Sequence, residues 1–300
     1  MKILLFGKNG QVGWELQRSL APLGELIALD ADSRERCGDF TDLEGLIQTI
    51  RAVAPDVIVN AAAHTAVDKA ESEPELVRAI NALAPAALAQ EAKRSNAWLI
   101  HYSTDYVFDG SGDRPWRETD NAVPLSVYGA TKLEGELLIQ QTACRHLIFR
   151  TSWVYGARGS NFARTMLHLA QERDSLTVIN DQIGAPTGAD LLADVTAHAI
   201  RAARQQPELS GLYHLVADGE TSWHDYAGFV LDYVRRAGIP LKVKPEAIRP
   251  VPSSAFPLPA RRPLNSRLDT TKLQHAFDLS LPVWQNGVAR MLAEVLDSGK

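Results

Sequence analysis

The sequence predicts an α/β fold of the Rossmann type, in which a doubly wound parallel sheet is followed by a smaller C-terminal lobe. Short apolar runs alternate with amphipathic helical patterns through the first half of the chain, which is typical of βαβ units. Glycines follow the first apolar run at once, and small or polar residues follow the later ones. The alternation breaks near residue 155, so we expect residues 1–155 to form the sheet, with some later segments returning to it, and residues 156–300 to form mainly the lobe.

The composition favours a folded protein with a small-molecule ligand. The 300 residues are 45% hydrophobic and carry a formal net charge of -5. Because there is no basic run, we expect neither nucleic acid nor an anionic membrane as the main partner. Only Cys37 and Cys144 are present, which excludes a disulfide framework and fits a reducing cytoplasm. The apolar opening Ile3–Phe6 is too short for a signal peptide, and no apolar stretch approaches the roughly 20 residues of a membrane span.

The first element should be a strand over residues 2–6, because its continuous apolar run suits a central parallel strand. Gly7, Gly10 and Gly13 follow, and then apolar residues at helical spacing. Glycines at such a turn let backbone N–H groups approach a pyrophosphate at the positive end of a helix dipole. A plain tight turn would use the same spacing. Its position between a strand and a helix predicts that residues 1–155 form a dinucleotide-binding domain.

The second strand, residues 25–29, ends in Asp30. An acid at this position can hold the ribose 2′-hydroxyl of NAD, whereas Arg34 and Arg36 close behind it could pair with the 2′-phosphate of NADP. An ordinary polar residue at a strand end is the alternative interpretation of Asp30. The choice between NADH and NADPH is therefore open at this point.

The third strand, residues 56–60, leads into Asn60-Ala61-Ala62-Ala63. Small side chains at the carboxyl edge of a parallel sheet leave room for a cofactor. His64 can be a ligand contact or a polar loop residue, and the loop residue is slightly favoured. Asp39 and Phe40, in the connection before this strand, lie where an adenine could be flanked, although a loop acid and a capping aromatic would look the same.

The candidate proton donor is Tyr128, four residues before Lys132. On a helix these two side chains share one face, where an ammonium can lower the pKa of a phenol. Thr104 follows the fourth strand, residues 98–102, and can supply a second hydroxyl to a substrate oxygen. Ser103 is the lower-ranked neighbour. If Tyr128 and Lys132 are considered without their neighbours, the simplest interpretation is a half-buried tyrosine beside a solvated lysine.

After a fifth strand at residues 146–150, the regular alternation ends. Further helices, one more strand, a polar loop and a Pro-rich segment indicate the small lobe. The expected segments are helices over residues 43–50, 76–92, 161–173, 189–204 and 223–237, a strand over 213–216, a polar loop over 180–187 and a Pro-rich span over 245–263. Within that span, residues 250–263 are expected to form a rigid ordered loop, with a linker as the less favoured alternative.

A dinucleotide crevice with a tyrosine, a lysine and a threonine at its rim predicts hydride transfer to or from a carbon that bears oxygen. In the reducing direction Tyr128 would give a proton to the ketone oxygen while Thr104 binds that oxygen. Lys132 would lower the pKa of Tyr128 and bind the nicotinamide ribose. This chemistry needs no metal.

These residues resemble the extended short-chain dehydrogenase/reductase superfamily and, within it, the dTDP-4-dehydrorhamnose reductase family. The resemblance covers essentially the whole chain, and the motif at residues 103–110 is more specific than the glycine turn. It implies reduction of the C4 ketone of dTDP-4-dehydro-L-rhamnose to dTDP-L-rhamnose with NADH or NADPH, the last step in making a sugar donor for the cell envelope. The matching motifs are Gly7-x-x-Gly10-x-x-Gly13, residues 60–71, residues 103–110, Tyr128-x-x-x-Lys132, Arg262-Pro263, Ser266 and Leu268-Asp269.

The resemblance also implies roles for single residues. Sugar contacts would fall on Thr104, Asp105 and Trp153, and the lobe would bind the sugar nucleotide. Some relatives form a homodimer with Mg²⁺ held by carboxylates at the interface, for which this chain offers three acids. The implied cofactor contacts are Gly7, Gly10, Gln11, Val12, Gly13, Asp30, Asp39, Phe40, Ala63, His64, Thr65, Tyr128 and Lys132, and the three acids are Glu15, Asp190 and Glu294.

Two other functions fit parts of the pattern. A 4,6-dehydratase or 4-epimerase of the same superfamily would keep the Tyr-Lys pair, but dehydratases carry Asp-Glu directly after the threonine, and here Asp105 precedes Tyr106. A non-catalytic regulatory subunit would commonly lose part of the Tyr-Lys-Thr set. This chain retains all three residues.

Overall fold

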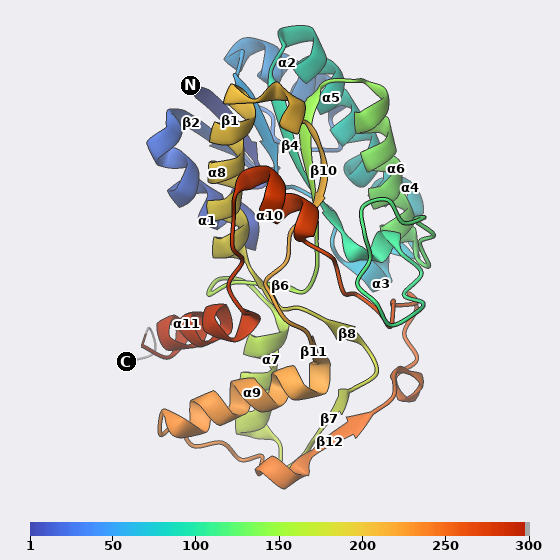
Figure 1. The fold of residues 1–300 in the computed structure, drawn as a ribbon, viewed down its shortest axis with the longest axis vertical. Coiled ribbons are helices and arrows are strands. Elements are labelled where there is room, and N and C mark those ends of the chain that lie inside the picture. The colour runs from blue at the N-terminus through green and yellow to red at the C-terminus, as the bar shows by residue number, and fades with distance from the viewer. Residues whose placement is uncertain (298–300) are drawn as a thin grey trace.

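The computed structural model describes residues 1–297, and its larger part is built on a six-stranded parallel sheet with the order β10-β5-β4-β3-β1-β2 (Figure 1). Strands β3 and β4 are buried along their whole length, as their continuous apolar runs require when helices cover both faces. The predicted doubly wound α/β fold is confirmed. The strands are β1 (Lys2–Phe6), β2 (Glu25–Leu29), β3 (Val57–Asn60), β4 (Trp98–Thr104), β5 (Arg145–Thr151) and β10 (Gly211–His214).

Helices cover both faces of this sheet (Figure 1). Ile3 and Leu5 of β1 belong to the core on one face, and Leu4 and Phe6 to the core on the other, as the alternation of side chains along a strand requires. The helices of the first face are α1 (Gln11–Leu20), α8 (Ala189–Gln205) and α10 (Thr271–Phe277). Those of the second face are α2 (Leu43–Val53), α5 (Ala84–Ser95) and α6 (Val127–Gln141). Both β10 and α8 come from beyond residue 156.

The smaller lobe lies below the sheet in Figure 1 and has its own core. Tyr226, Val230 and Trp284 are central to this core. Its helices are α7 (Phe162–Glu172), α9 (Trp223–Arg236) and α11 (Trp284–Asp297). Its strand pairs are β6 (Val154–Tyr155) with β9 (Thr187–Gly188), β7 (Leu176–Ile179) with β12 (Ile248–Val251), and β8 (Ile183–Gly184) with β11 (Thr221–Ser222).

The single helix expected over residues 76–92 is wrong. The segment comprises α4 (Pro74–Arg78), a π-helical turn η2 (Ala79–Leu83) and α5. Pro85 explains the interruption, because it has no N–H to donate to the carbonyl of Asn81. A short helix α3 (Val67–Ala70) precedes α4, and 3-10 turns occur at η1 (Ala21–Leu23), η3 (Asp105–Val107), η4 (Pro207–Leu209), η5 (Pro245–Ala247) and η6 (Ser253–Ala255).

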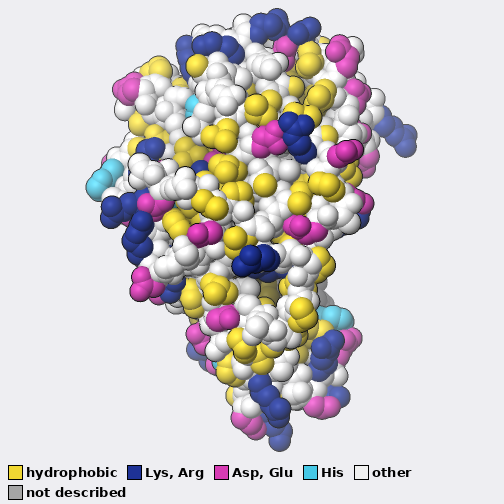
Figure 2. Space-filling model, turned by 90° about the vertical axis from the view of Figure 1, so that its right-hand side faces the viewer, with side chains coloured by type: hydrophobic (Ala, Val, Ile, Leu, Met, Phe, Trp, Pro, Cys, Tyr) yellow, Lys and Arg dark blue, Asp and Glu magenta, His cyan; other side chains and the backbone are white. Residues whose placement is uncertain are grey.

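Charges of both signs are interspersed on the face shown in Figure 2, over the sheet and over the narrower lobe. Among residues 1–297, none of the helices combines the length and the apolar character that crossing a bilayer would need.

Candidate active site

The glycine turn lies between β1 and α1 at the carboxyl edge of the sheet. Gly7 has a φ of +85°, and a Cβ there would stand 2.7 Å from the backbone of Ala61. A Cβ on Gly13 would stand 1.9 Å from the carbonyl oxygen of Gly7. No side chain caps the first turn of α1, because its N-cap is Gly10. The turn is therefore closely packed from behind and offers free N–H groups at a helix N-terminus, which suits a pyrophosphate.

Two other predicted cofactor residues begin α1. Gln11 is the first residue of the helix, and its Oε1 accepts a hydrogen bond of 3.1 Å from Nδ2 of Asn161. Val12 packs against the core between α1 and the sheet. The side chain of Gln11 thus links the glycine turn to the segment that precedes α7.

Asp30 lies directly after β2 and beside the glycine turn. Its carboxylate accepts hydrogen bonds from the backbone N–H of Asn9 at 3.0 Å and from that of Ala31 at 2.8 Å. Asp39 caps its own turn by accepting from Thr41, and the ring of Phe40 packs edge-to-face on Phe6 in the core. Of these predicted contacts, Asp30 has the carboxylate nearest the turn, whereas Phe40 is mainly a core residue.

The loop that contains Ala63, His64 and Thr65 is fixed by Asn81, which the π-helical turn carries. The Asn81 side chain accepts from the N–H of His64 at 2.9 Å and donates to the carbonyl of His64 at 3.1 Å. It also lies 3.5 Å from Oγ1 of Thr131 on α6. Asn81 therefore joins the predicted cofactor loop to helix α6, which carries Tyr128 and Lys132. Single π-helical turns occur frequently at functional sites.

Thr104 and Tyr128 meet as the sequence predicts. Thr104 is the last residue of β4, and α6 begins just before Tyr128, where the Ser126 hydroxyl accepts from the N–H of Gly129 at 3.2 Å. Burial raises the pKa of Tyr128 to about 12, although a hydrogen bond with Thr104 partly opposes this. The pair can present two hydroxyl groups to one substrate oxygen.

Lys132 is buried on the same helix, with 2% of its surface exposed. Its Nζ donates to the carbonyl of Tyr102 at 2.6 Å and lies 3.3 Å from Nε2 of His101. Burial lowers the pKa of Lys132 to about 8. The groups that shift the pKa of Tyr128 are Thr104 and Asp105. The expected lowering of the Tyr128 pKa by Lys132 is thus not observed in this arrangement.

The two remaining predicted sugar contacts are Asp105, which directly follows Thr104, and Trp153, which follows β5. Asp105 is 2% exposed, and its Oδ1 accepts from the Thr104 hydroxyl at 3.1 Å. Burial raises the pKa of Asp105 to about 6, with hydroxyls of Ser266 and Thr104 opposing the shift. Trp153 has a φ of +49° and stacks on Trp223 with ring centroids 3.6 Å apart. An uncommon backbone conformation in a non-glycine residue often marks a functional site.

Comparisons with known proteins identify the family of this chain. Residues 1–297 match the family described as the RmlD substrate binding domain. The chain is 63% identical to the dTDP-4-dehydrorhamnose reductase of Salmonella typhimurium and 62% identical to that of Escherichia coli, over 295 residues and 98% of each chain. The chain belongs to the dTDP-4-dehydrorhamnose reductase family.

Solved structures of this family have the same fold. A dTDP-4-dehydrorhamnose reductase from Clostridium acetobutylicum is 36% identical, with a TM-score of 0.88 over 99% of this chain and 100% of that one. Another from Bacillus anthracis, solved in complex with NADP, is 32% identical, with a TM-score of 0.86 over 98% of this chain and 99% of that one.

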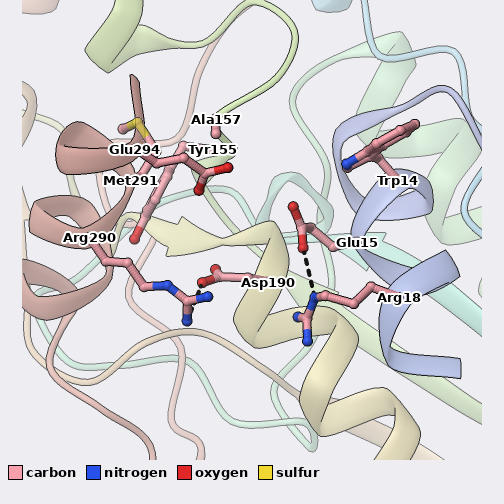
Figure 3. Close-up of a pocket in the computed structure, with 10 residues that line it drawn as sticks. Trp14, Glu15, Arg18, Tyr155, Ala157, Asp190, Arg290, Met291 and Glu294 are labelled. Carbon is pink, nitrogen blue, oxygen red and sulfur yellow. Dashed lines mark hydrogen bonds and ion pairs between the residues drawn. The ribbon is translucent and has the colours of Figure 1, made fainter. Parts of the chain in front are cut away.

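The three acids suggested for Mg²⁺ line one pocket (Figure 3), and Tyr128 is not among the residues that line it. Glu15 comes from α1, Asp190 from α8 and Glu294 from α11, around a volume of about 210 Å³. Arg18 lies 3.4 Å from the Glu15 carboxylate, and Arg290 lies 3.5 Å from that of Asp190. Within residues 1–297, the His, Cys, Asp and Glu side chains form no group of three that could hold a metal.

Two residues important to this geometry, Asn81 and Trp223, carry no local signal in the sequence. Asn81 lies inside what reads as a continuous helix, and Trp223 begins a helix 70 positions after its stacking partner Trp153. Arg262 was part of the family resemblance, and the structure shows its guanidinium 2.7 Å from the carboxylate of Asp68. Such long-range pairs follow from the tertiary fold, so periodicity and local motifs do not show them.

Proposed function

We propose that this chain catalyses the NAD(P)H-dependent reduction of the C4 ketone of dTDP-4-dehydro-L-rhamnose to dTDP-L-rhamnose. One observation carries the proposal: the Thr104–Tyr128 pair lies at the carboxyl edge of the sheet in a chain 63% identical to a dTDP-4-dehydrorhamnose reductase. The relative solved with NADP supports the cofactor. The residues of the site support a ketone reduction, which is the reaction that the names of these relatives indicate.

In the proposed mechanism, Tyr128 donates its hydroxyl proton to the C4 oxygen as the C4 carbon gains a hydride, so that the carbonyl becomes an alcohol. A bound nicotinamide supplies the hydride. Thr104 hydrogen-bonds the same oxygen where negative charge develops. Tyr128 is buried, so it remains protonated at neutral pH and is a donor rather than a base in this direction.

The dinucleotide would bind along the edge of residues 1–155, and the sugar nucleotide mainly in residues 156–300, of which 298–300 lie outside the described part. Asp105 and Trp153 would contact the sugar, and Lys132 would bind the nicotinamide ribose. The proposed cofactor contacts are Gly7, Gly10, Gln11, Val12, Gly13, Asp30, Asp39, Phe40, Ala63, His64 and Thr65, together with Tyr128 and Lys132.

We further propose a cytoplasmic homodimer, with Mg²⁺ held where a second copy would add carboxylates to Glu15, Asp190 and Glu294. A single chain offers no metal site among its described residues, so metal binding and dimerisation should occur together. Sedimentation with and without a chelator measures this. If the dimer persists in the presence of the chelator, the proposal that Mg²⁺ is bound at the dimer interface is contradicted.

The substrate proposal is tested by incubating the protein with NADPH and a panel of nucleotide 4-keto sugars and following NADPH absorbance. We expect oxidation of NADPH with dTDP-4-dehydro-L-rhamnose. Bound NAD in the purified protein without net oxidation of added NADPH would indicate an epimerase instead, and no turnover together with intact ligand binding would indicate a regulatory subunit.

The role of Tyr128 is tested by Tyr128→Phe, which removes only the hydroxyl. We expect kcat to fall by about 10² to 10⁴, while NADPH binding stays within about threefold of that of the unsubstituted protein. Tyr213→Phe is the matched control, because its hydroxyl donates to the carbonyl of Leu209, and it should leave kcat unchanged. Near-normal turnover of Tyr128→Phe would exclude Tyr128 as the proton donor.

A further inference from the structure

The catalytic lysine belongs to a buried chain of polar side chains that the reaction itself does not explain. Asn60 ends β3, and His101 lies beside it on β4 in the parallel register. Both are 1% exposed. Nδ2 of Asn60 lies 3.0 Å from Nδ1 of His101, and Nε2 of His101 lies 3.3 Å from Nζ of Lys132. The three side chains form one continuous line from the cofactor loop to the catalytic helix.

The orientation of the Asn60 amide is fixed by the backbone. Oδ1 of Asn60 accepts from the N–H of Ala62 at 3.0 Å, so the NH₂ group must face His101. Flipping the amide would set two N–H donors against each other at Ala62, which is costly in a buried site. Nδ1 of His101 is therefore the acceptor in this pair.

This hydrogen bond fixes the proton on the other side of the ring. Burial and the nearby Lys132 lower the pKa of His101 well below its ordinary value, so the ring is neutral. A neutral imidazole whose Nδ1 accepts carries its proton on Nε2. Nε2–H thus points at Nζ of Lys132, which can pair with it only through the lone pair of a neutral amine. An ammonium at this position would place a donor against a donor.

The remaining neighbours are compatible with a neutral amine. Nζ donates to the carbonyl of Tyr102 at 2.6 Å, which an amine N–H can do. Glu136, one turn along α6, favours the ammonium. Arg150 of β5 donates hydrogen bonds as short as 2.6 Å to the Glu136 carboxylate. The positive charge of the Arg150 guanidinium therefore offsets the negative charge of Glu136. His146 of β5 acts on His101 and disfavours imidazolium there.

We propose that Asn60 and His101 are positioning residues that stabilise the neutral amine of Lys132 against β4, and that binding of the dinucleotide releases Lys132, whose neutral fraction then takes up a proton. The inference rests on the proposed role of Lys132 as an ammonium on the nicotinamide ribose. The proton comes from solvent and is added to the Nζ lone pair, which no longer faces Nε2–H of His101. Cofactor affinity should therefore fall with rising pH.

The test measures proton uptake when NADPH binds, by titration calorimetry at about pH 8.5 in two buffers that differ in ionisation enthalpy. Because the pKa of Lys132 is lowered to about 8, the unsubstituted protein should take up about three quarters of a proton. Its Kd for NADPH should rise by up to about tenfold per pH unit above that pKa. Binding without net proton uptake would overturn the proposal.

Two variants should abolish the uptake in different ways. His101→Gln can turn a carbonyl oxygen toward Nζ, and Asn60→Asp has no NH₂ group, so His101 would carry its proton on Nδ1 and present Nε2 as an acceptor. Both should keep Lys132 as an ammonium before binding, with uptake below about 0.2 proton and a Kd nearly independent of pH.

His198→Gln is the matched control, since His198 lies on α8 outside this line and its Nε2 lies 2.9 Å from the Phe277 carbonyl. It should retain the uptake of the unsubstituted protein. If either His101→Gln or Asn60→Asp folds and shows the proton uptake of the unsubstituted protein, the proposal is overturned. If one of these two variants fails to fold, the other still provides the test. Absence of NADPH binding to the unsubstituted protein would instead contradict the proposed function.

Discussion

Single residues at this site are chemically defined by burial as much as by identity. Asp105 and Lys132 are each 2% exposed, and burial moves their pKa values in opposite directions, up to about 6 and down to about 8. Both shifts favour the neutral form of the side chain. The protein therefore loses stability when either group is charged and unpaired, and this loss can be measured for Asp105.

Asp105→Asn should stabilise the protein at high pH. The folded-state pKa of Asp105 is raised from 3.8 to about 6, so its contribution to stability is full below pH 3.8 and is lost as pH rises through 6. The loss is about 3 kcal/mol. The difference in free energy of unfolding between the variant and the unsubstituted protein should rise by up to this amount between about pH 4 and pH 8 in urea titrations. Asp113→Asn, at an exposed position, should show no such trend. A difference independent of pH would show that burial does not favour the neutral form of Asp105.

Asp30→Ala should shift the cofactor preference toward NADPH. The Asp30 carboxylate accepts a hydrogen bond from the N–H of Asn9. It would also accept a hydrogen bond from a ribose 2′-hydroxyl, but it would repel a 2′-phosphate. We expect the ratio of kcat/KM for NADPH to that for NADH to rise about tenfold. The ratio is measured because loss of the hydrogen bond to Asn9 can weaken the binding of both cofactors. Asp32→Ala, at the exposed neighbouring position, should leave the ratio unchanged, and an unchanged ratio in Asp30→Ala would show that Asp30 does not reach the ribose.

At the scale of elements, the sequence predicted most strands and the helix of Tyr128 because their signals are local. Continuous apolar runs identified β1 and β3, and spacing placed Tyr128 and Lys132 on one helix. The π-helical turn was missed, because an apolar helical pattern runs through it and only the missing N–H of Pro85 disturbs the ladder. The line from Asn60 to Lys132 was missed too, because it depends on strand register and on the direction of one amide.

The contact between η2 and α6 is the element-scale feature most open to test. A Cβ on Gly135 of α6 would stand 2.3 Å from the carbonyl oxygen of Asn81. Gly135→Ala should therefore force the two elements apart and lower the free energy of unfolding by about 1 to 3 kcal/mol. Gly228→Ala is the matched control inside helix α9, because a Cβ there meets nothing within 4 Å. It should be neutral or stabilise by up to about 1 kcal/mol. Equal effects of the two variants in urea titrations would show that α6 does not depend on this close approach.

At the scale of the whole molecule, the C-terminal part of the chain joins the two lobes around the candidate site. Gln182 accepts from the indole N–H of Trp223 and donates to Ser253, so it braces the aromatic stack from the Pro-rich loop. Further along, the N–H of Asn265 donates to the carbonyl of Gly110 at 3.0 Å. Arg262 contacts Asp68, a residue of α3 that lies close in sequence to the predicted cofactor loop. Residues 250–268 thus lie against both lobes. These contacts order the Pro-rich segment, which contains the end of β12 and the turn η6 as well as loop.

The Arg262–Asp68 pair should couple this loop to the sheet domain. Arg262 donates two hydrogen bonds to the Asp68 carboxylate, at 2.7 and 3.1 Å, and this lowers the pKa of Asp68. Because Asp68 is 38% exposed, solvent screening limits the coupling energy in a cycle of Arg262→Gln and Asp68→Asn to about 1 kcal/mol. The coupling should be present at neutral pH and disappear as pH falls through the lowered pKa of Asp68.

The same Arg262→Gln variant should raise KM for the sugar nucleotide by about 5- to 10-fold, because the loop carries Ser266 to the buried carboxylate of Asp105. The Kd for NADPH should change by less than about twofold, since the glycine turn does not depend on this loop. Arg78→Gln, which removes a comparable pair with Glu134 on the surface, is the control and should change neither constant. If Arg262→Gln altered NADPH binding as much as sugar binding, the loop would act on the whole crevice rather than on the sugar side alone.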